Sequence, residues 1–201
     1  INDASFSYSN GSIVWAQQIA DPRWEMRSFS DIFLYDIQEG RKQRLTKKRR
    51  LLYPVLNSEG TEIACIEERI DGSSHLVILN SDGLEVASVA APSGYVFRQP
   101  VWSDSGRHIY ALQTGRDGKK LVDWNIAEPG KEVLHDFGFK EVNQMDRLGD
   151  HLVFSAPIGT VQGLYAFNLN DKSINKIAAS ENGLDYPGVS GGKLCVSVFS
   201  T

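Results

Sequence analysis

The sequence predicts an all-β protein, a β-propeller of four-stranded antiparallel blades with four full repeats plus a half blade. One recurring phrase ends a short strand with Asp or Asn, at Asp36, Asn80, Asn125 and Asn168. These positions are 44, 45 and 43 residues apart. A turn containing Gly or small polar residues, followed by a β-rich run, precedes each phrase. Four-stranded units at this period are typical of propeller blades.

The β-rich runs define the second strand of each repeat. Each run follows a Gly turn and is rich in Val, Ile, Leu and aromatic residues, and no window has helical apolar spacing long enough to predict a helix. Stacked blades bury each other's apolar side chains, which accounts for this composition. We expect the core positions of these strands at Ile13, Ile63, Ile109, Leu152 and Leu194.

Prolines open three of the repeats, at Pro54, Pro100 and Pro187, and the fourth repeat has Val142–Met145 in that place without Pro. We expect each Pro at the first residue of its strand, where no ladder donor is lost. The third repeat illustrates the expected strands: 100–103, 108–113, 120–126 and 131–134.

The expected organisation is a single propeller domain or fragment over 1–201. Its approximate repeats are 4–46, 53–87, 99–134, 142–177 and 186–201. The fifth repeat supplies only two strands and the first already has four, so we expect an incomplete ring with apolar faces at both ends. Such a chain either self-associates through its open edges or belongs to a protein longer at one or both ends.

Composition narrows the function classes. The 201 residues are 41% hydrophobic and 23% charged, with a formal net charge of -4, which is globular composition without the basic excess of a nucleic-acid binder. No apolar run is long enough to span a membrane. Cys65 and Cys195 lie in apolar runs and are expected to be unpaired small hydrophobes. Without clustered ligands, we expect no cofactor and no metal site.

The segment Pro100–Tyr110 reads Pro-Val-Trp-Ser-Asp-Ser-Gly-Arg-His-Ile-Tyr. It resembles the TolB-like, WD-like propeller repeat, whose phrase runs roughly Pro-x-Trp-Ser-Pro-Asp-Gly-x-x-Ile-x-Phe. It departs from that phrase in having Asp-Ser where the family often has Pro-Asp. The resemblance covers nearly the whole chain and implies a propeller. Because the family includes periplasmic scaffold proteins and propeller halves of peptidases, it also implies an extracytoplasmic bacterial setting.

The long connection 21–30 in the first repeat is the candidate binding segment. It carries aromatic residues beside arginines, the pair most enriched at binding hot spots. The basic run 47–50 follows in a connection expected on the same face. The predicted protein- or peptide-binding residues are Arg23, Trp24, Arg27, Phe29, Lys48, Arg49 and Arg50. The alternatives are a loop that packs across its own propeller and a solvated charge run.

Other candidates have structural explanations. The segment 188–192 matches the nucleophile-elbow pattern Gly-x-Ser-x-Gly around Ser190, but it aligns with a hairpin turn, and no His follows it. His108 and His151 occupy equivalent strand positions and are expected to be tolerated edge residues. The Asp and Asn residues of the recurring phrase are expected to stabilise turns rather than form a ligand ring.

The function expected from the sequence is a non-catalytic propeller module for protein or peptide binding, part of a larger extracytoplasmic protein. The alternative is the propeller domain of a larger peptidase or hydrolase whose catalytic domain is absent from this chain. A propeller enzyme with its own central site would need convergent carboxylates or histidines. The sequence shows no such set.

Overall fold

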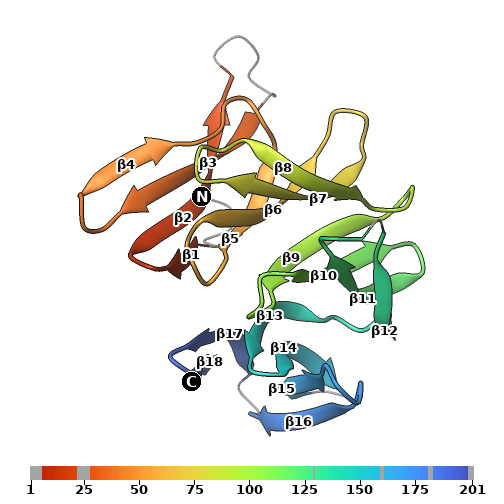
Figure 1. The fold of residues 1–201 in the computed structure, drawn as a ribbon. Coiled ribbons are helices and arrows are strands. Elements are labelled where there is room, and N and C mark those ends of the chain that lie inside the picture. The colour runs from red at the N-terminus through yellow and green to blue at the C-terminus, as the bar shows by residue number, and fades with distance from the viewer. Residues whose placement is uncertain (1–5, 22–27, 129, 159–160, 181–182, 199–201) are drawn as a thin grey trace. The chain divides into compact units, whose positions relative to one another are not determined.

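The computed structural model describes residues 6–21, 28–128, 130–158, 161–180 and 183–198. These residues form strands, turns and connections only, so the fold class is all-β as predicted (Figure 1). Strands of consecutive number pair as antiparallel neighbours, and the chain therefore builds four four-stranded sheets followed by one two-stranded sheet. Within these ranges, no helix exists that could cross a membrane.

The four four-stranded sheets and the final two-stranded sheet agree with the predicted fold class. The first contains β1 (Phe6–Ser9), β2 (Ser12–Ala20), β3 (Ser28–Asp36) and β4 (Arg41–Arg44). The second contains β5 (Leu51–Leu56), β6 (Glu62–Glu68), β7 (Ser74–Asn80) and β8 (Glu85–Ala90). The third contains β9 (Val96–Trp102), β10 (His108–Gly115), β11 (Gly118–Asn125) and β12 (Glu132–Gly138). The fourth contains β13 (Asn143–Leu148), β14 (His151–Ile158), β15 (Val161–Asn168) and β16 (Ile174–Ala179), and the half blade contains β17 (Leu184–Ser190) and β18 (Lys193–Val198).

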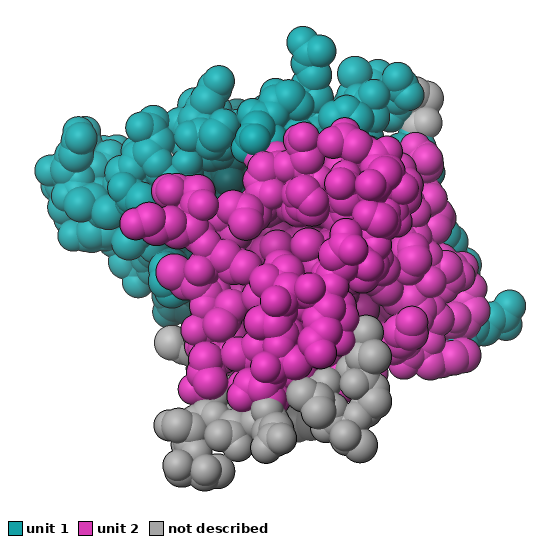
Figure 2. All heavy atoms as spheres, turned by 90° about the horizontal axis from the view of Figure 1, so that it is seen from below, with its two compact units in different colours: residues 1–116, 123–131 teal, residues 117–122, 132–201 magenta. Residues whose placement is uncertain are grey.

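The chain divides into two compact units, residues 1–116 with 123–131 and residues 117–122 with 132–201 (Figure 2). The first two sheets lie wholly in the first unit, and the fourth sheet and the half blade lie wholly in the second. The single domain expected from the repeats stays a prediction.

The prolines do not open their strands, so that prediction was wrong. In the second sheet Leu52 pairs with Ile66 and Val55 with Ala64, which leaves one extra residue on β5. Pro54 therefore lies in a β-bulge, three residues after the strand begins. A bulged residue is left out of the ladder, so the missing N–H of Pro costs no hydrogen bond.

The same bulge recurs in the first strand of the third, fourth and fifth repeats. In each case the residue before the Pro position has a left-handed backbone. These residues are Tyr53, Gln99, Gln144 and Tyr186, with φ of 52°, 51°, 50° and 54°. Such a conformation is uncommon outside glycine, and here the repeat keeps it even where Met145 replaces Pro.

A core cluster of the first unit lies between the first two sheets. Its buried members come from β2, β3, β5, β6 and β7: Val14, Ile32, Leu51, Leu56, Ile63, Cys65, Val77 and Leu79. Ile63, Ile109 and Leu152 are buried as expected, whereas Ile13 and Leu194 are only partly buried, and Val14 takes the core position of β2. Cys65 is buried and Cys195 is exposed, so only the first behaves as the predicted small hydrophobe.

The recurring Asp and Asn residues stabilise turns, as predicted. The Asp36 carboxylate accepts hydrogen bonds from the backbone N–H groups of Gln38 and Glu39, both at 2.9 Å. The amide oxygens of Asn80, Asn125 and Asn168 accept equivalent bonds from the residue two positions on. This is the Asx-turn geometry that favours Asp and Asn at the ends of strands.

Candidate functional site

The start of β3 and the start of β5 lie side by side in the first unit. The backbone N–H of Ser30 donates to the carbonyl of Arg49 at 2.8 Å, and the Ser30 hydroxyl donates to the carbonyl of Leu51 at 2.7 Å. The predicted residue Phe29 is therefore adjacent in space to the basic run 47–50. Arg23, Trp24 and Arg27 lie outside the described residues, so their predicted role stays a prediction.

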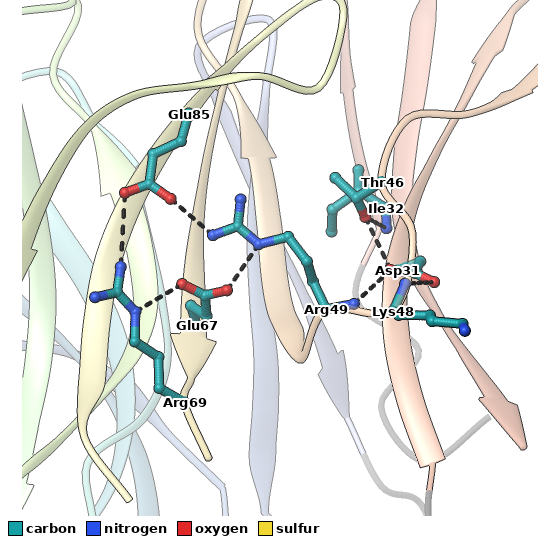
Figure 3. Close-up of polar contacts among 8 residues, drawn as sticks. All are labelled: Asp31, Ile32, Thr46, Lys48, Arg49, Glu67, Arg69 and Glu85. Carbon is teal, nitrogen blue, oxygen red and sulfur yellow. Dashed lines mark hydrogen bonds and ion pairs between the residues drawn. The ribbon is translucent and has the colours of Figure 1, made fainter. Parts of the chain in front are cut away.

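The carboxylate of Asp31 fixes the backbone of the basic run (Figure 3). Asp31 is fully buried, and its oxygens accept bonds from the N–H groups of Lys48 and Arg49, both at 3.0 Å. The Thr46 hydroxyl and the Arg44 guanidinium donate to the same carboxylate at 3.1 and 2.6 Å. A buried carboxylate needs such donors. They hold Lys48 in a left-handed conformation, with φ of 59°.

Arg49 points into the molecule and is part of an ion-pair network. Its guanidinium lies 2.7 Å from Glu67 and 2.7 Å from Glu85. Arg69 reaches the same two carboxylates at 3.0 and 3.6 Å, so the four side chains alternate in charge (Figure 3). The basic run is therefore not a uniform patch, because its third residue is neutralised by acids from β6 and β8.

The network stabilises the charged forms of Glu67 and Arg49. Burial works against the charge of Glu67, but hydrogen bonds from Arg49 and Arg69 outweigh it and hold the pKa of Glu67 below its ordinary value. Burial likewise opposes the charge of Arg49, and the hydrogen bonds to Glu67 and Glu85 raise its pKa. Arg49 thus has a structural role in joining the first two sheets.

Lys48 and Arg50 differ from Arg49 in having exposed side chains. Neither makes an ion pair or a side-chain hydrogen bond with any residue that the structure describes. The bend at Lys48, where the backbone is left-handed, separates its side chain from that of Arg49. Lys48 and Arg50 are therefore cations of the run without a partner among the described residues.

These residues line an open groove of about 560 Å³ between the first two sheets. Its volume is within the range of ligand pockets. The lining joins residues from the start of β3, the basic run, the end of β6 and the turn that follows it: Phe29, Lys48, Arg49, Arg50, Glu67, Glu68, Arg69, Ile70 and Asp71. Four of the seven residues predicted from sequence are thus brought together.

The turn 69–73 forms a wall of the groove and was missed from sequence. Its N–H and carbonyl groups close on each other, with Gly72 donating to the carbonyl of Arg69 at 3.0 Å. The Asp71 carboxylate accepts from the Ser73 hydroxyl at 2.6 Å and from its N–H at 2.9 Å. The side chain of Ile70 is 81% exposed at the tip. An Ile inside a polar turn was the signal that could have identified this wall.

Two other residues considered from the sequence, Ser190 and His108, lie at positions that the fold explains. Ser190 is the last residue of β17, pairs with Lys193 of β18 and lies in the predicted hairpin. His108 does more than occupy an edge, because its Nδ1 lies 3.0 Å from both carboxylate oxygens of Asp123 on the third strand of its blade. In the described part of the chain, no three His, Cys, Asp or Glu side chains gather in a way that could hold a metal ion.

No family model and no curated protein matches the sequence. Solved structures do match the fold. The putative TolB from Agrobacterium tumefaciens has a TM-score of 0.69 at 12% identity, and TolB from Acinetobacter baumannii has a TM-score of 0.68 at 10% identity. The matches cover 91% and 94% of this chain and 64% and 50% of those proteins.

A similar match is an acylaminoacyl peptidase in complex with a chloromethyl ketone, with a TM-score of 0.65 at 14% identity, over 96% of this chain and 35% of that protein. Together with the blade architecture, these similarities show a β-propeller of the kind found in TolB proteins and in the propeller parts of peptidases. At these identities the likeness is one of fold. The chain spans less than two thirds of the length of each.

Proposed function

We propose that this chain is a non-catalytic β-propeller module that binds a protein or peptide segment in the groove beside Phe29 and Ile70. The single observation that carries the proposal is the composition of the groove. An exposed aliphatic side chain and an aromatic one lie beside two cations, Lys48 and Arg50, that have no partner among the described residues. Apolar anchors next to arginine are the usual content of a binding hot spot.

The setting we propose is a larger extracytoplasmic protein, as the resemblance to TolB propellers suggests. The fold likeness to acylaminoacyl peptidase and to prolyl endopeptidases supports a second candidate. In that case the chain is the propeller domain of a larger peptidase or hydrolase, and the groove positions a substrate segment for a catalytic domain elsewhere in the protein.

The experiment that tests groove binding is an array of random 12-residue peptides, acetylated and amidated at their ends, probed with the labelled chain. Ile70→Glu should abolish binding to the strongest peptides, because it places a carboxylate at the apolar wall. Phe139→Glu is the matched control: Phe139 is also 81% exposed and does not line the groove. The absence of peptides that distinguish the two variants would contradict the proposal.

The non-catalytic part of the proposal has its own test. Because Ser190 lies in a hairpin rather than at a strand-to-helix turn, its hydroxyl should not react with a fluorophosphonate probe. Stoichiometric labelling of the purified chain that is lost in Ser190→Ala would show a nucleophilic serine and overturn this part.

A further inference from the structure

We propose that the groove selects peptide segments in which an acidic side chain lies next to an apolar one, with Arg50 and Lys48 binding the carboxylate. This inference rests on the proposed function and specifies its ligand. It depends on which charges around the groove are already paired and which are not.

The paired charges form the floor of the groove. Glu67 is held by Arg49 and Arg69, and Glu68 is held by Arg98 at 2.9 Å. The described lining contains four cations and three carboxylates, which gives one net positive charge. The ion-pair partners Arg98 and Glu85 outside the lining carry opposite charges, so including them does not change this net charge. That charge is carried at the surface, where Lys48 and Arg50 have no partner among the described residues.

The backbone places Arg50 with little freedom. Its carbonyl accepts from the N–H of Glu68 at 3.0 Å, and the carbonyl of Arg49 accepts from Ser30 on the other side. Ser30 and Arg50 also form a parallel β-bridge. This short segment is therefore hydrogen-bonded to both sheets at once. A guanidinium on such a base can bind a carboxylate through two parallel hydrogen bonds at reduced entropic cost.

The apolar part of the ligand would contact Phe29 and Ile70. Phe29 precedes the bridge residue Ser30, and Ile70 protrudes from the turn 69–73, which also lines the groove. A ligand side chain that packs against these two residues removes apolar surface from water, at about 25 cal/mol for each Å². The carboxylate supplies orientation, and the apolar neighbour supplies affinity.

The fixed acids of the groove favour a carboxylate over a phosphate group. Glu67, Glu68 and Asp71 line the same space, and hydrogen bonds from Ser73 lower the pKa of Asp71, so that it stays ionised at neutral pH. A single negative charge compensates the net charge of the groove. A phosphate group carries nearly two charges at pH 7 and would be repelled by these carboxylates.

The peptide array described above tests this inference with one further comparison. Peptides whose binding depends on Ile70 should be enriched in Asp or Glu beside an apolar residue. Arg50→Gln should weaken their binding about tenfold, which corresponds to about 1.4 kcal/mol, and Lys48→Gln should weaken it less. Arg41→Gln on the exposed strand β4 is the matched control and should leave binding unchanged. Melting temperatures of all variants should stay near that of the unmodified chain.

The possible failures are distinguishable. Ile70-dependent peptides without acidic enrichment, or with equal binding to Arg50→Gln, would overturn the carboxylate inference while groove binding stands. Stronger binding when phosphoserine replaces the acidic residue would also overturn it. The absence of any Ile70-dependent peptide would overturn the proposed function and this inference with it.

Discussion

At the scale of single residues, the buried carboxylate of Asp31 decides how the basic run is presented. It accepts four hydrogen bonds that converge from 44, 46, 48 and 49, and it thereby separates an inward Arg49 from outward Lys48 and Arg50. The groove consequently depends on a residue that does not line it.

Asp31→Asn tests this dependence. The amide keeps the shape but offers only one acceptor oxygen and directs an NH₂ group at N–H donors, so we expect a loss of about 3 kcal/mol in unfolding free energy. Asp36→Asn is the matched control, because Asn already occupies the equivalent position in three other repeats. Its effect should be within about 0.5 kcal/mol. Equal effects in urea unfolding would contradict the role assigned to Asp31.

The Glu67 ion pairs predict a specific pH dependence. Since the pKa of Glu67 is lowered in the folded state, the carboxylate contributes stability above its ordinary pKa of 4.5, and this contribution is lost as pH falls through the folded pKa. Glu67→Gln removes the titrating group. The two proteins should therefore differ in unfolding free energy at pH 7 and converge as pH falls through the lowered pKa of Glu67. Parallel curves would mean that Glu67 is not preferentially charged in the fold.

At the scale of strands and turns, two glycines in the second sheet can be compared. Both have a positive φ, but only one of them lies against the backbone of another segment. Gly72 and Gly83 have nearly the same φ, 83° and 79°. A Cβ at position 72 would meet nothing, whereas a Cβ at position 83 would collide with the backbone of Leu45 from the preceding connection. Only the second glycine is required by its neighbour.

We expect Gly72→Ala to cost about 1 kcal/mol, the ordinary penalty for a left-handed non-glycine residue. Gly83→Ala should cost at least about 3 kcal/mol, because backbone atoms of Leu45 in the connection after β4 must move. Chemical denaturation of the two variants measures the difference. Similar losses would show that the turn 80–84 can move away from Leu45 without penalty.

The blade pattern could be predicted from sequence because it depends on short-range features, namely period-two apolar runs and Asx turns. The bulge before each Pro could not, since Tyr53 and Gln144 carry no composition signal for a left-handed backbone. The ion pairing of Arg49 could not be predicted either, because its partners Glu67 and Glu85 lie 18 and 36 residues away in sequence. Pairing of this kind is set by the packing of two sheets.

At the scale of the whole molecule, the first sheet has an apolar face that does not pack against the second sheet. Register places Tyr8, Ile13 and Tyr35 in line across β1–β3, with Trp15 beside Phe33. In the second sheet the equivalent positions are buried against the first: Leu56, Ile63, Cys65, Val77 and Leu79. Phe6 and Tyr8, by contrast, are 69% and 61% exposed.

The purified chain should therefore self-associate through this face, because an exposed apolar patch favours association. Phe6→Lys combined with Tyr8→Lys should shift the chain toward monomer in light scattering, and Phe139→Lys should not. Both altered residues are exposed, so folding should be unaffected. A monomer at all concentrations for the unmodified chain would contradict this prediction.

The two cysteines differ in exposure, and the rates at which they are alkylated therefore report on how often the buried one becomes accessible. Burial raises the pKa of the Cys65 thiol, so the thiolate that alkylating reagents need does not form inside the second sheet, while Cys195 is open to solvent. A pulse of iodoacetamide should add one mass increment at once. The second increment should arrive only at the rate at which the interior around Cys65 opens. Mass spectrometry of this single unmodified chain would thus time the opening of its first unit without an engineered label.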